Sequence, residues 1–145
     1  RNTLKSAIVK SNAVTEVTIN GKTMTVAEAI ERKNSIDYDE TFLAEMKRQY
    51  ASATDTVTKE NKKVDNKVDE LLATLIGKDS SKEVNKDSQE AIEKPYRAKN
   101  EFEFIDPIGI WDKIEALEAD IDGFKASVDT TLSVANATSF IEVDF

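Results

Sequence analysis

The segment from Lys94 to Phe104 places aromatic rings beside cations, a combination that can bind a nucleotide. Tyr96 and Phe102 can stack on a planar base, while Arg97 and Lys99 can pair with phosphate oxygens. Proteins hold single nucleotides in this way without a glycine-rich loop. The same aromatic side chains can instead cap the end of a helical hairpin. The sequence leaves both interpretations open: a ligand site at Tyr96, Arg97, Lys99 and Phe102, or a packed cap.

Residues 118–129 approximate the spacing of a calcium-binding loop, with carboxylates at alternate positions before Gly123. The first ligand position holds Glu118, where Asp is preferred, and the last holds Asp129, where a bidentate Glu is needed. The helical hydrophobic period also runs straight through the segment. A solvated helix face therefore explains these carboxylates better, and we predict no metal site.

The absence of two residue types argues against an enzyme. The chain contains no His and no Cys, so it lacks the commonest general base, the commonest transition-metal ligand and every thiolate nucleophile. A hydrolase that uses magnesium held by carboxylates is the remaining catalytic alternative. We therefore predict a non-enzymatic protein without catalytic residues or cofactors.

Composition also restricts the partners. The net charge is −8, which removes the broad positive surface that DNA and RNA binding requires, although a local cationic pocket for a small phosphate-bearing nucleotide is still allowed. No stretch approaches the roughly 20 apolar residues that cross a bilayer, and no signal peptide is recognisable. We predict a soluble cytoplasmic protein that binds neither nucleic acid nor membrane. Its helical period at residue 1 suggests part of a longer chain.

The first half of the chain predicts a β-hairpin between helices. Residues 1–13 match the end of a helix, and residues 15–26 alternate about Asn20-Gly21, a strong two-residue turn signal. Thr25 and Glu28 have capping-box spacing and predict a helix over 26–34. A longer helix is predicted over 38–76, with Thr54 and Asn61 as polar seam positions that fix register. Its apolar seam repeats every seven residues at Leu43, Tyr50, Val57, Val64 and Leu71.

The second half predicts a short helix over 83–93 that ends before Pro95, then a loop over 94–105. Asp106-Pro107 is a favourable helix start and predicts a long helix over 107–135. A terminal strand is predicted over 139–144. The seam of the last long helix consists of Ile110, Ile114, Leu117, Ile121, Phe124 and Val128.

Two long helices with apolar seams bury those seams on each other or on a second copy of the chain. We therefore predict a single, mainly α domain over residues 1–145, formed by an antiparallel, coiled-coil-like hairpin of long helices. The β-hairpin lies at one end, and the terminal strand extends it to a small three-stranded sheet.

At residues 11–19, 25–33 and 106–138 the chain resembles small helical proteins encoded by phages and prophages of Gram-positive bacteria. The resemblance carries no catalytic residues. It implies an anti-defence protein that sequesters a host factor, foremost a nucleotide immune signal, as a helical homo-oligomer. The alternative is a structural or assembly coiled-coil protein, such as a virion component or an adaptor.

Overall fold

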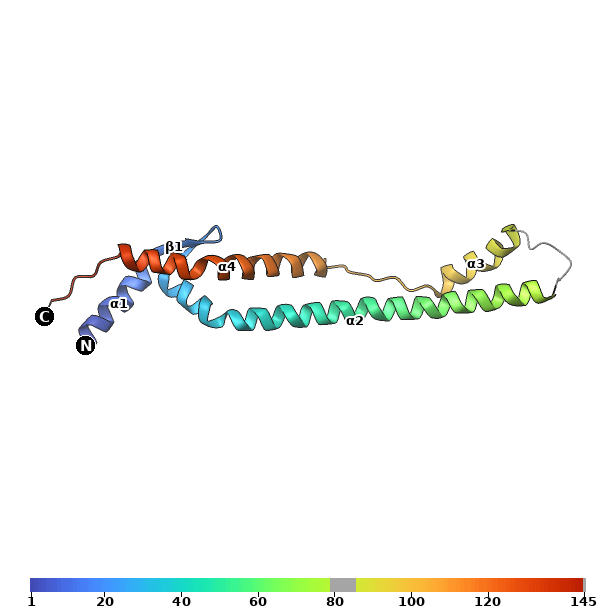
Figure 1. Cartoon of the computed structure of the whole chain (residues 1–145), viewed down its shortest axis with the longest axis horizontal. Helices are drawn as coiled ribbons and strands as arrows, with labels where there is room; N and C mark the ends of the chain where they lie inside the picture. Colours follow the sequence, from blue (N-terminus) through green and yellow to red (C-terminus); the bar gives the residue numbers. More distant parts are fainter. Residues whose placement is uncertain (79–85, 145) are drawn as a thin grey trace. The chain divides into compact units, whose positions relative to one another are not determined.

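The computed structural model describes residues 1–78 and 86–144, which form helices joined to one β-hairpin (Figure 1). The fold class is confirmed as a helical hairpin with a small β-hairpin. The described elements are, in chain order, α1 (Asn2–Val14), β1 (Glu16–Ile19), β2 (Lys22–Thr25), α2 (Val26–Lys78), α3 (Lys86–Asn100) and α4 (Ile110–Thr138).

The predicted single domain is subdivided into two compact units. Unit 1 consists of Arg1–Lys47 and Gly109–Phe145, and unit 2 consists of Arg48–Ile108. The long helix α2 contributes its first part to unit 1 and its remainder to unit 2.

The β-hairpin of unit 1 turns at Asn20-Gly21, whose φ angles of 51° and 76° lie in the left-handed region. Asn and Gly tolerate this conformation best, which is why the pair marks a tight turn. The strands are antiparallel, with Val17 opposite Met24. Val17 and Ile19 are buried, and β1 packs against α4. The predicted hairpin is confirmed.

The predicted capping box at the start of α2 is also confirmed. The Thr25 N–H donates to the Glu28 carboxylate at 2.7 Å, and the Glu28 N–H donates to the Thr25 hydroxyl at 3.1 Å. The Val26 N–H donates to the Thr15 carbonyl at 2.8 Å. These bonds tie the first turn of α2 directly to the β-hairpin.

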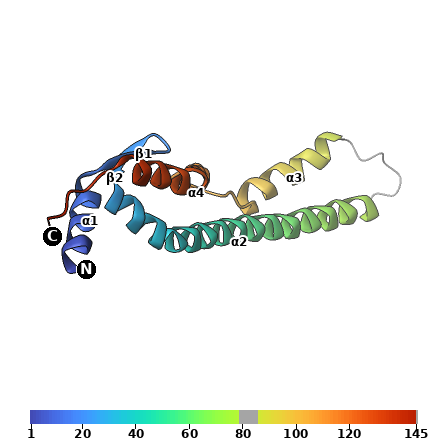
Figure 2. The ribbon, with the colours of Figure 1, turned by 60° about the vertical axis from the view of Figure 1, so that its left-hand side comes forward.

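Within unit 1, α4 runs antiparallel to the first part of α2, and the two helices lie side by side in both views (Figures 1 and 2). Three cross-helix ion pairs define the register, because positions rise along α2 as they fall along α4. These pairs are Lys33 with Asp129, Glu40 with Lys125, and Lys47 with Glu118. Ile36 and Leu43 of α2 are buried, as are Ile114, Ile121, Phe124 and Val128 of α4.

In unit 2, α3 and the chain that follows it cover the seam of α2. Val64 and Val68 are buried. The Tyr50 and Phe104 rings meet edge to face, with centroids 5.3 Å apart. The prediction that residues 43–75 pack lengthwise on 110–128 therefore overstates the contact with the last helix. Inside unit 2, residues 86–108 cover the apolar seam of α2.

Two predicted helices, 26–34 and 38–76, are one continuous helix. Ala29, Ile36 and Leu43 are buried at seven-residue spacing across the predicted break, so one buried face persists. Asp37, just before the predicted start at residue 38, lies inside α2 and does not begin a helix. Instead, the Asp37 carbonyl accepts a bond from the Thr41 hydroxyl at 2.8 Å, as happens inside a helix.

The predicted boundary between the short helix 83–93 and the loop 94–105 is wrong. Residues 83–85 lie outside the described residues, and α3 continues through Pro95 to Asn100. Proline removes one backbone donor, but the helix resumes beyond it. Between α3 and α4, only residues 101–109 are non-helical.

The helix predicted over 107–135 begins later and ends later, at Ile110 and Thr138. Gly109, at φ 62°, occupies the N-cap position, because its left-handed backbone separates the Asp106-Pro107 turn from the helix.

The predicted terminal strand over 139–144 is also wrong, and the sheet has two strands rather than three among the described residues. Ile141 instead lines a cavity of about 150 Å³ with Ile8 and Val26. Residues 139–144 thus lie beside this cavity through the Ile141 side chain and form no backbone ladder with the β-hairpin.

Among the described residues, no helix is long and apolar enough to cross a membrane.

Candidate functional site

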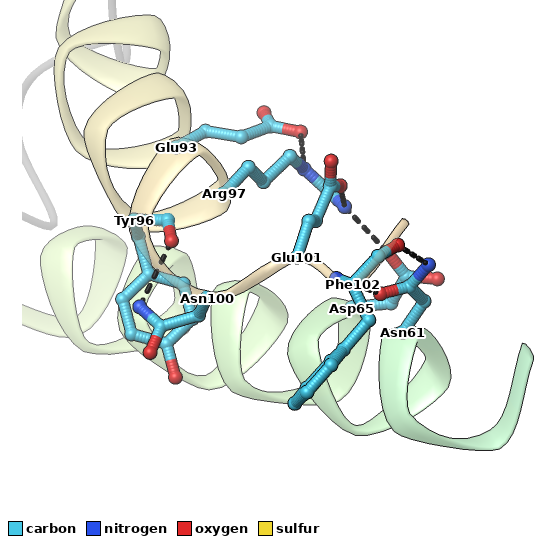
Figure 3. A network of polar contacts seen from close by, with 8 residues as sticks. All are labelled: Asn61, Asp65, Glu93, Tyr96, Arg97, Asn100, Glu101 and Phe102. Carbon is cyan, nitrogen blue, oxygen red and sulfur yellow. Dashed lines mark hydrogen bonds and ion pairs between the residues drawn. The ribbon is translucent and has the colours of Figure 1, made fainter. Parts of the chain in front are cut away.

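Asn61 of α2 forms two hydrogen bonds with the chain that follows α3 (Figure 3). Its Nδ2 donates to the Phe102 carbonyl at 2.9 Å, and its Oδ1 accepts from the Phe102 N–H at 2.8 Å. One amide side chain thereby satisfies both polar groups of a residue that lies outside regular secondary structure. Because both bonds require the same alignment, they fix which residue of the segment 101–108 lies over Asn61.

Arg97 of α3 lies at the centre of an acidic cluster (Figure 3). Its guanidinium donates to Asp65 at 2.5 Å, to Glu93 at 2.8 Å and to Glu101 at 3.0 Å. These bonds, with Asp65 first, raise the pKa of Arg97 above its ordinary value. Three carboxylates around one cation leave the cluster with an excess of negative charge. An anionic ligand would therefore have to compete with them for Arg97.

A groove of about 300 Å³ lies beside this cluster in unit 2. Lys63 on its wall pairs with Glu60 at 2.8 Å, whereas Lys99 has no ion-pair partner within residues 1–78 and 86–144. Phe102 is 54% exposed, so part of it is accessible to a ligand. The lining residues are Glu60, Lys63, Val64, Tyr96, Lys99, Asn100, Glu101 and Phe102.

The structure therefore brings three of the four predicted ligand residues to one groove. Tyr96, Lys99 and Phe102 line it. Arg97 does not, and its guanidinium is bonded to carboxylates instead. Tyr96 and Arg97 are neighbours on a helix, so their side chains leave the axis about 100° apart. A loop over 94–105, as predicted, would not impose this helical angle between neighbouring side chains. For that reason both residues were predicted in one site.

Sequence reasoning missed the residues of α2 that complete this region, above all Asp65. The polar seam position Asn61 was the available signal, since a polar residue in an apolar seam fixes register. Asn61 does fix a register, but that of the chain after α3 rather than of a paired long helix.

A second polar cluster surrounds Asp120 of α4 in unit 1. Lys22 of β2 and Arg32 of α2 donate to its two oxygens at 2.9 and 2.6 Å. The hydrogen bond from Lys22, followed by that from Arg32, lowers the pKa of Asp120 against the opposing effect of burial. Arg32 also lies over the Phe124 ring, 4.4 Å from its centroid. The cluster joins three elements around one carboxylate.

The carboxylates that approximate a calcium loop lie on α4 and serve this cross-helix pairing. Glu118, Asp120 and Asp129 each pair with a cation of α2. Within the described ranges, no group of three or more acidic side chains is arranged to hold a metal ion. The segment is helical, as its period predicted, but three of its carboxylates pair with cations of α2 and do not face solvent alone.

No protein-family model, curated protein or solved structure matches this chain.

Proposed function

We propose that this chain is a non-enzymatic assembly protein that associates with copies of itself through apolar side chains left uncovered by its own fold. Among the described residues, 13 apolar residues are buried, whereas 14 large apolar side chains are exposed. Single exposed apolar residues are ordinary, but clusters of them are typical of protein interfaces. The exposed set is Leu4, Ile8, Val9, Val14, Ile30, Tyr38, Phe42, Phe102, Ile105, Ile108, Trp111, Val134, Phe140 and Ile141.

Two sets of these exposed side chains lie in unit 1. One group lies on α1, a helix with no buried residue, and includes Val9 and Val14. The other is the pair Tyr38 and Phe42, one helical turn apart on α2. The non-enzymatic part of the proposal rests on the sequence, which has neither His nor Cys.

Sedimentation velocity and native mass spectrometry of the full chain test the proposal directly. We expect a homo-oligomer whose population grows with protein concentration. Its assembly should survive moderate salt, since apolar burial is not screened. A protein that stays monomeric from micromolar to near-millimolar concentration would contradict it.

The second candidate function is the capture of a small anionic ligand that carries a planar ring. The groove in unit 2 favours it, because Lys99 lacks an ion-pair partner among the described residues and lies near the exposed ring of Phe102. The resemblance to phage-encoded proteins suggests a nucleotide immune signal as that ligand. Glu60 and Glu101 on the same wall oppose an anion, so this function is placed second.

Calorimetric titration against cyclic and linear nucleotides tests the second function. We expect Lys99→Ala and Phe102→Ala to weaken any binding by about tenfold each, through loss of a phosphate contact or a stacked ring. Lys62→Ala, an exposed lysine outside the groove, is the matched control. Absence of heat across the whole panel would remove this candidate.

A further inference from the structure

The outward face of α1 is a basic surface formed by Asn2, Lys5, Ser6, Val9 and Lys10. Val9 lies among the two lysines and is 58% exposed. Neither lysine has an ion-pair partner among the described residues, and the first acidic residue of the chain is Glu16. This face therefore complements an apolar side chain that has carboxylates beside it.

The outward face of α2 in unit 1 has this complementary chemistry. Tyr38 and Phe42 are 79% and 59% exposed and lie one turn apart, so their rings share a face. Glu31 lies two turns before Tyr38 on the same face, and Asp39 lies beside Phe42.

The cations nearest to this face in the sequence point the other way. Arg32 is bonded to Asp120, and Lys33 is bonded to Asp129, both on α4. The exposed aromatic pair is therefore flanked by negative charge that no neighbouring cation of α2 neutralises.

We propose that the outward face of α1 docks on the Tyr38 and Phe42 face of α2 in a second copy of this chain. The proposal rests on the assembly function above and names its contact. Lys5 and Lys10 would lie against Glu31 and Asp39, with an aromatic ring over Val9, where a lysine can also contact the ring face. Each patch alone exposes apolar surface to water, and each carries the charge that the other lacks.

A second copy fits better than an unrelated partner because the chain carries both halves of the contact. In a two-fold dimer, residue i of one copy meets residue j of the other and the reverse, so both patches are used twice. α1 contacts β2 within its own chain and splays away from α2 in both views (Figures 1 and 2). Its outward face is thus available to another copy.

Charge reversal in the full chain tests this contact. One variant carries Lys5→Glu and Lys10→Glu, and the other carries Glu31→Lys and Asp39→Lys. We expect each variant alone to self-associate about 100-fold more weakly than the natural chain, because like charges then face each other. An equimolar mixture should regain association as a one-to-one heterodimer, since both contacts are again of opposite charge. Native mass spectrometry distinguishes the two chains by mass.

The matched control reverses Lys62 and Lys113, two exposed lysines outside both faces, and should associate as the natural chain does. Circular dichroism of each variant alone verifies that its helices are intact. Variants that still associate normally would overturn the proposed contact and leave the assembly function standing. A mixture that stays monomeric would also overturn the contact. A natural chain that never associates would overturn both proposals, and so would monomers that bind only anionic vesicles.

Discussion

Single polar side chains hold this thin fold in register. Asn61 bonds both polar groups of Phe102, and Asp120 receives Lys22 and Arg32 from two other elements. None of the described polar or charged residues is buried, so these contacts form at the edge of the apolar seam. Of these four hydrogen bonds, only the one from Arg32 is partly buried, so water can satisfy most of the groups that lose a partner.

Asn61→Ala should lower the free energy of unfolding by about 1–2 kcal/mol, because two bonds to Phe102 are lost together. Chemical denaturation with far-UV circular dichroism measures the change. Asn34→Ala, an exposed position on the same helix, should change it by less than about 0.5 kcal/mol. Equal effects of the two substitutions would contradict the role given to Asn61.

Asp120 should make the stability of unit 1 sensitive to acid. Its pKa is lowered in the folded protein, first by the Lys22 hydrogen bond, so its contribution is present above the unfolded carboxyl pKa. That contribution is lost as the pH falls through the lowered folded value. Thermal melts from about pH 6 to about pH 2 should show a smaller acid-induced decrease for Asp120→Asn than for the natural chain. Identical pH profiles would refute this assignment.

At the scale of elements, the turn of the β-hairpin approaches α4 closely at Gly123. A Cβ built on Gly123 would lie 2.5 Å from the Asn20 side chain, a distance that real Cβ atoms essentially never show. Glycine is unfavourable inside a helix by about 1 kcal/mol relative to alanine. Its presence in the middle of α4 is therefore explained by the Asn20 side chain that lies against it.

Gly123→Ala forces the exposed Asn20 side chain to move aside, so it should stabilise the protein by less than the roughly 1 kcal/mol that helix propensity alone would give. Adding Asn20→Gly should restore the full gain, since glycine suits the positive φ of Asn20 and removes the overlapping atoms. Denaturation midpoints of the two single variants and the double variant complete the cycle. Additive effects would show that the two positions do not meet.

At the scale of the whole molecule, two compact units share one helix. Each unit covers its own part of α2, with α4 and the β-hairpin in unit 1 and with residues 86–108 in unit 2. Segments with separate cores can open separately even where the backbone is continuous.

Core truncations should therefore act on one unit at a time. Phe124→Ala removes a fully buried ring and should speed amide hydrogen exchange in unit 1, whereas Val68→Ala should do so mainly in unit 2. Mass-spectrometric exchange on peptides from both units measures this. Lys62→Ala, at an exposed position of α2, should leave both patterns unchanged. Uniform acceleration throughout the chain would mean that the units open together.

Local chemistry was sufficient to predict several elements. The Asn20-Gly21 turn and the Thr25 with Glu28 capping box depend on residues close in sequence, and both are confirmed. The apolar seam of α4 depends on helical periodicity alone, and its central residues Ile114, Ile121, Phe124 and Val128 are buried. Tyr96, Lys99 and Phe102 also reach a common groove.

Tertiary contacts decided the remaining features, because local sequence preference allows several packing partners for the same side chain or helix. Only the folded structure determines which partner is used. Arg97 was expected to pair with phosphate, but it bonds Glu93 and Glu101 one helical turn away and Asp65, which is distant in sequence. The seam of α2 fits any apolar helix, so its periodicity alone does not distinguish α4 from residues 86–108. The last residues alternate like a strand, yet among the described residues they pair with neither strand of the β-hairpin, and Ile141 lines a cavity with Ile8.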